Sequence, residues 1–119
     1  MSADFRAVRE IWGEPCGAFL EHDALLSFLE VIADSANTRS QSDEYSDKTA
    51  VFVANGTAFV DYVESNPEFT TDFMMVQLGD QGHTSDAESV DLQVKNAKMH
   101  ASEWRRNISE DGTLRFYVD

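Results

Sequence analysis

The sequence is poor in cysteine, in basic side chains and in long apolar runs. Its single cysteine, Cys16, excludes an intramolecular disulfide framework and suits a reducing compartment. No apolar run approaches the roughly 18 residues that a membrane-spanning helix needs, and the N-terminus shows no signal peptide. We therefore expect a cytoplasmic protein. Residues 1–119, with 42% apolar content, are enough for a single compact domain with its own core.

The shortage of basic residues is the most unusual feature. There are 9 Lys and Arg against 22 Asp and Glu, which gives a net charge of −13. Direct binding to nucleic acid or to an anionic membrane is therefore disfavoured, because phosphate contacts need cations. Acids and bases balance within residues 85–108, so the whole excess of negative charge lies elsewhere in the chain.

Motifs that carry chemistry are also missing. The sequence has no Gly-rich nucleotide loop, no H-E-x-x-H, no C-x-x-C and no G-x-S-x-G. The three histidines, His22, His83 and His100, are too far apart in sequence for a local metal site. We therefore predict no catalytic residue, no metal ligand and no cofactor.

The clearest element that is present covers residues 85–108. Its apolar residues recur at alternating steps of three and four, which places them on one helical stripe. They are Ala87, Val90, Val94, Ala97, Ala101, Trp104 and Ile108. Ser85 and Glu88 match a capping box, so we predict a long amphipathic helix that begins at Ser85.

The remaining pattern predicts two N-terminal helices and a small sheet. The helices are expected at 4–12 and 23–36, the second apolar nearly all round and therefore buried. Strands are expected at 49–54, 72–78 and 113–119. Asn55-Gly56 favours a hairpin turn with a return strand at 57–63, although a short helix capped by Thr57 fits the same residues.

These elements predict an α+β fold. It would combine the two N-terminal helices, an antiparallel sheet of three or four strands, and the long helix packed across that sheet. Residues 37–48 are polar without periodicity and are interpreted as a mobile loop.

Charge and size favour a small acidic binding protein that is not an enzyme and that occupies a basic surface of a partner protein. The expected contact residues are Asp43, Glu44 and Asp47, with Tyr45 as an aromatic anchor. The expected partner is a basic, nucleic-acid-binding protein. Inhibitors that mimic nucleic acid and immunity proteins, of the kind that phages and mobile elements encode, act in this way as classes. Leu92 and Met99 lie on the far side of the long helix and could form a homodimer contact.

Two alternatives fit the same sequence. The acidity could be an adaptation to high salt in a housekeeping domain. Alternatively, the loop from Asp80 to Asp86, with its carboxylates and His83, could hold a metal or small ligand in an enzyme domain.

Overall fold

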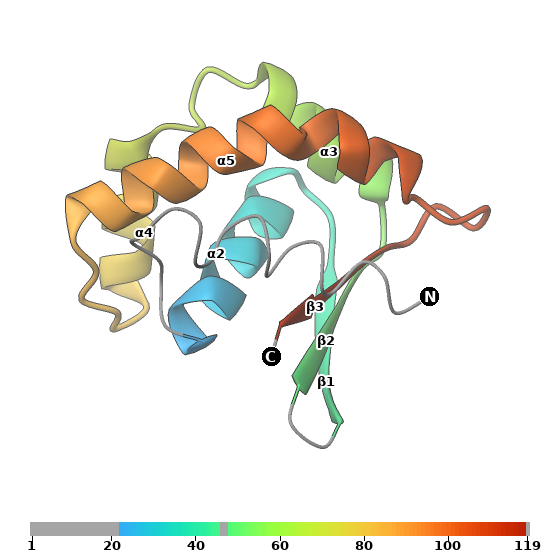
Figure 1. Cartoon of the computed structure of the whole chain (residues 1–119), viewed down its shortest axis with the longest axis horizontal. Coiled ribbons are helices and arrows are strands. Elements are labelled where there is room, and N and C mark those ends of the chain that lie inside the picture. The colour runs from blue at the N-terminus through green and yellow to red at the C-terminus, as the bar shows by residue number, and fades with distance from the viewer. Residues whose placement is uncertain (1–21, 46–47, 119) are drawn as a thin grey trace.

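The computed structural model of this chain describes residues 22–45 and 48–118. Within them it has an α+β architecture, with four helices and a three-stranded antiparallel sheet (Figure 1). This confirms the predicted fold class. The predicted pair of N-terminal helices is not matched, since the described chain begins with one helix, α2, and the helix expected at 4–12 lies outside the described residues.

Helix α2, His22–Ser35, confirms the prediction of a buried helix. Phe28, Leu29 and Ile32 are completely buried in it. The helix ends in a Schellman motif, in which the N–H of Thr38 donates to Ala33 and Asn37 adopts a left-handed φ of 59°. α2 lies beneath the long helix α5 in Figure 1 and packs against α3, α4 and both outer strands of the sheet.

The strand predicted at 72–78 is wrong, because these residues lie in helix α4, Thr71–Asp80. The Thr70 side chain accepts a hydrogen bond of 3.2 Å from the N–H of Phe73 and caps this helix. Met74 and Leu78, four residues apart, are buried, whereas Val76 between them is 60% exposed. The apolar run therefore has one buried helical face rather than the two buried faces of a central strand.

The hairpin predicted at Asn55-Gly56 is also wrong. Helix α3, Gly56–Ser65, begins there, as in the alternative reading, but its cap is Asn55 and not Thr57. The Asn55 side chain accepts a hydrogen bond of 3.1 Å from the N–H of Ala58. Asparagine is common both in tight turns and at helix caps, so the dipeptide alone does not separate the two structures.

The sheet instead begins within the polar stretch that was interpreted as a loop. Strand β1, Ser40–Tyr45, pairs with β2, Lys48–Val53, and β2 pairs with β3, Leu114–Val118. The strand order is β1-β2-β3. A polar sequence can form an outer strand, because the pairing uses backbone groups and an outer strand need not enter the core.

The long helix α5, Ala87–Arg106, is confirmed, but its predicted capping box is wrong. Its cap is Asp86, whose carboxylate accepts a hydrogen bond of 2.8 Å from the N–H of Ser89. The helix packs mainly against α3 and α4 rather than across the sheet. It reaches the sheet through Trp104. The centre of the Trp104 ring lies 5.2 Å from the centre of the Phe116 ring on β3.

Candidate functional site

The predicted contact residues lie on strand β1 and at its end. Asp43 and Glu44 are exposed on β1, opposite Ala50 and Thr49 of β2. Tyr45 is the last residue of the strand and lies opposite Lys48. Asp47 lies outside the described residues. The structure thus places three of the four predicted residues on one strand, which presents them consecutively.

The direction of the β1 backbone groups follows from one hydrogen bond. The N–H of Ala54 donates to the carbonyl of Arg39 over 2.8 Å, in register with the β1–β2 pair. Opposite residues in an antiparallel pair alternate between hydrogen-bonded and non-hydrogen-bonded positions. Arg39 is in a hydrogen-bonded position opposite Ala54. The residues at odd steps from it, Ser40, Ser42 and Glu44, are therefore in non-hydrogen-bonded positions and direct their N–H and C=O groups away from β2. We call residues Ser40–Glu44 the β1 edge.

Within the β1 edge, residues 41–44 are exposed and only Ser40 is half-buried. Ser42 and Glu44 lie on the same face of the sheet as Val51 and Val53. The two valines are buried, whereas Ser42 and Glu44 are exposed. In Figure 1 the β1–β2 hairpin extends away from the helices, although Val51 and Val53 of β2 belong to the core. Core packing therefore does not explain why the β1 edge is acidic.

Two cations of α5, Arg105 and Lys95, form ion pairs within the molecule. Arg105 donates from Nη2 to Asp61 at 2.8 Å and to Glu64 at 2.6 Å, both on α3, and these bonds raise the pKa of Arg105. Lys95 contacts Asp91 at 2.8 Å. Hydrogen bonds from the Lys95 ammonium, which has the larger effect, and from the Thr71 hydroxyl lower the pKa of Asp91. In the described part of the chain, by contrast, no salt bridge involves Asp43 or Glu44.

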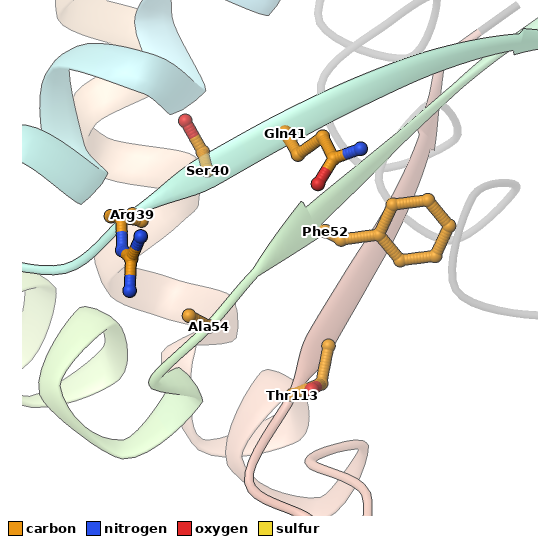
Figure 2. A pocket seen from close by; sticks show the side chains of 6 residues that line it. All are labelled: Arg39, Ser40, Gln41, Phe52, Ala54 and Thr113. Carbon is orange, nitrogen blue, oxygen red and sulfur yellow. The ribbon is translucent and has the colours of Figure 1, made fainter.

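A hollow of about 330 Å³ lies at the base of the hairpin (Figure 2). Six residues line it: Arg39, Ser40, Gln41, Phe52, Ala54 and Thr113. Gln41 and Phe52 are directly opposite each other, and Figure 2 shows their side chains on the same side of the sheet. The Arg115 guanidinium lies 5.8 Å from the centre of the Phe52 ring. Arg39, just before β1, and Arg115, on β3, thus lie near the base of the hairpin, and the carboxylates lie farther along β1.

No sequence pattern indicated this hollow, because its lining comes from three separate segments of the chain. The strands that bring these segments together were only partly predicted. Its six lining residues include no pair of side chains arranged as a nucleophile and a base.

A second hollow, of about 490 Å³, lies between the end of α2 and helix α3. Tyr62 lines it together with polar residues that include Ser35 and Asp61. Burial raises the pKa of the Tyr62 phenol, while the nearby Ser35 hydroxyl opposes part of that rise. The geometry between the two hydroxyls is not that of a good hydrogen bond.

The loop from Asp80 to Asp86 has a structural explanation for most of its residues. Gly82, with φ 86°, and His83 form a Schellman motif at the end of α4, since the N–H of His83 donates to Leu78 over 2.9 Å. His83 Nε2 lies 2.8 Å from Ser27 Oγ and joins α4 to α2 by a hydrogen bond. Asp86 caps α5.

The other chemistry-bearing residues are also dispersed. His100 lies 3.4 Å from the carboxylate of Glu103 on the same helix. Cys16 and the side chain of His22 lie outside what the structure describes. Among residues 22–45 and 48–118, no group of three or more His, Cys, Asp or Glu side chains could hold a metal ion.

Leu92 and Met99, the predicted homodimer contact, differ in exposure. Met99 is 68% exposed, whereas Leu92 is half-buried. The dimer stays a prediction. A Met99→Lys variant that sedimented with the same mass as the wild type at every concentration would exclude a contact centred on Met99.

Comparisons with protein-family models, with curated proteins and with solved structures found no match for this chain. Within the described ranges, no helix has both the length and the apolar content required to cross a membrane.

Proposed function

We propose that this protein is a small acidic binding protein without enzymatic activity, and that it occupies a basic surface of a partner protein through the β1 edge. The observation that carries the proposal is the exposure of Asp43 and Glu44 on an outer strand of the described sheet, where neither side chain is buried in the core. Neither carboxylate has an ion-pair partner among the described residues, so both are free to meet cations of another molecule.

The overall charge supports the same proposal. A net charge of −13 attracts basic proteins over a distance and speeds their encounter. Proteins that bind nucleic acid carry basic grooves for phosphate, and we propose a partner of this class. Occupying such a groove would block it, which is the action of a nucleic-acid-mimicking inhibitor or an immunity protein of phage or mobile-element type.

The proposal is tested by capture from host lysate with three versions of the tagged protein, washed stepwise from low to high salt. These are the wild type, Asp43→Asn with Glu44→Gln, and a control with Glu30→Gln and Asp80→Asn. The control removes the same charge from exposed positions on α2 and α4.

We call Asp43→Asn with Glu44→Gln the hairpin variant. A single basic protein that is retained by the wild type and by the control, but not by the hairpin variant, would support the proposal. Equal retention by all three versions would contradict the assignment to β1. If the wild type retained nothing and folded only at high salt, the charge would serve solvation, as the salt-adaptation alternative requires.

A further inference from the structure

The outer side of β1 offers hydrogen-bonding groups in a regular row. Ser40, Ser42 and Glu44 direct their N–H and C=O groups away from β2, as the bond between Ala54 and Arg39 requires. β1 is an outer strand of the described sheet, and residues 41–44 are exposed. An extended peptide can continue a sheet by pairing with such a row.

Resting on the proposed function, we propose that the β1 edge binds an extended, basic segment of its partner by strand addition. The partner would then contribute an extended strand of its basic surface, which pairs with β1. Main-chain hydrogen bonds would supply affinity, and the carboxylates of Asp43 and Glu44 would select the sequence of the added strand.

The register of β1 specifies that sequence. Asp43 and Glu44 are consecutive, so their side chains lie on opposite faces of the sheet. A residue of an added antiparallel strand that lies directly opposite a β1 residue has its Cβ atom about 5 Å from the Cβ atom of that residue. This is close enough for their side chains to form an ion pair. The strand that fits therefore has two adjacent basic residues, one for each carboxylate. The small side chains of Ser40 and Ser42 accept any neighbour of moderate size.

The same carboxylates disfavour the other occupant of an open strand edge, a second copy of this chain. Antiparallel pairing of two β1 edges would bring acidic strands together, and like charges across a strand pair are destabilising. Charged residues on outer strands commonly prevent such self-pairing. An acidic edge thus rejects its own copy while remaining open to a basic strand.

Hydrogen exchange provides the test, with the acetylated and amidated hexapeptide Thr-Lys-Lys-Thr-Val-Thr as the probe. The amides of Ser42 and Glu44 are expected to exchange about tenfold more slowly when roughly nine-tenths of the protein is bound. The amide of Asp43 already points to β2, so its exchange should change less. The same peptide with Glu-Glu in place of Lys-Lys, or with N-methyl groups on the amides that face β1, should have no effect.

A proline variant then separates strand addition from simple charge attraction. Ser42→Pro removes an N–H that points outward, so the β1–β2 hydrogen bonds remain, and proline is tolerated at such positions of outer strands. Ser42→Thr keeps the N–H and is the matched control. We expect Ser42→Pro to lose at least tenfold in affinity for the peptide, and Ser42→Thr to bind as the wild type does.

The outcomes distinguish the two proposals. If Ser42→Pro bound the peptide as tightly as the wild type, or if bound peptide left the exchange of Ser42 and Glu44 unchanged, strand addition would be wrong. The proposed function would still be supported if Asp43→Asn with Glu44→Gln abolished binding of the captured partner. In that case β1 would contact a folded basic surface of the partner without adding a strand. If Ser42→Pro failed to fold, the exchange measurement on the wild type would decide alone.

Discussion

The N–H of Gly56 donates a hydrogen bond of 2.7 Å to the carbonyl of Gly112 and joins the start of α3 to the turn before β3. A Cβ atom at Gly56 would lie 2.9 Å from both Ile108 Cγ1 and Leu114 Cβ. Glycine is therefore required here by close packing and not by a hairpin turn. We expect Gly56→Ala to lower the free energy of unfolding by about 1–3 kcal/mol in urea titrations.

Gly79 provides the matched control for this substitution. It lies in α4, and an added Cβ would meet nothing within 4 Å. Alanine is the better helix former, so Gly79→Ala should leave stability unchanged or raise it by up to about 1 kcal/mol. Equal losses from both substitutions would contradict the close approach of α3 to the turn.

The hydrogen bond between Ser27 and His83 should contribute to the packing of α4 on α2. A double-mutant cycle with Ser27→Ala and His83→Ala should give a coupling free energy of about 0.5–1.5 kcal/mol. If the two effects were simply additive, the bond would contribute nothing to stability.

Asp111 should make stability depend on pH through the turn before β3. Its carboxylate accepts a hydrogen bond of 3.0 Å from the N–H of Thr113, and this bond lowers the pKa of Asp111. A carboxylate with a lowered pKa in the folded state stabilises the protein above its unfolded pKa, and this contribution disappears as the pH falls through the folded pKa.

The measurement for Asp111 is the free energy of unfolding of the wild type and of Asp111→Asn across a range of pH. The wild type should be the more stable near neutral pH, and the difference should shrink in acid. A difference that grew as the pH fell would contradict the assignment.

The helices with the strongest periodicity could be predicted from the sequence, and so could strands β2 and β3, expected at 49–54 and 113–119, but strand β1 and helix α4 could not. In α5 the apolar residues repeat over five turns, so a single interpretation fits. In α4 the run Phe73-Met74-Met75-Val76 is too short and too uniformly apolar to show its period, and the burial that separates Met74 from Val76 comes from tertiary packing.

Strand β1 shows why residues 43–45 could be proposed as contact residues from the sequence although the strand that carries them could not be predicted. The carboxylates at positions 43 and 44 were visible in the sequence as a polar, acidic stretch. Nothing in that stretch alternates between apolar and polar, and residues 41–44 of β1 are exposed on both faces of the strand. Its pairing depends on the apolar strand β2 beside it, and the hollow near Phe52 depends on β3 as well.

The central claim is that Asp43 and Glu44 attract and hold a basic partner. The most direct test is the association rate of the captured partner as a function of salt, measured for the wild type, Asp43→Asn with Glu44→Gln, and the control with Glu30→Gln and Asp80→Asn. We predict that the hairpin variant associates about tenfold more slowly at low salt and shows a flatter salt dependence, while the control stays close to the wild type. Identical rates and salt dependence for the hairpin variant and the control would contradict the account.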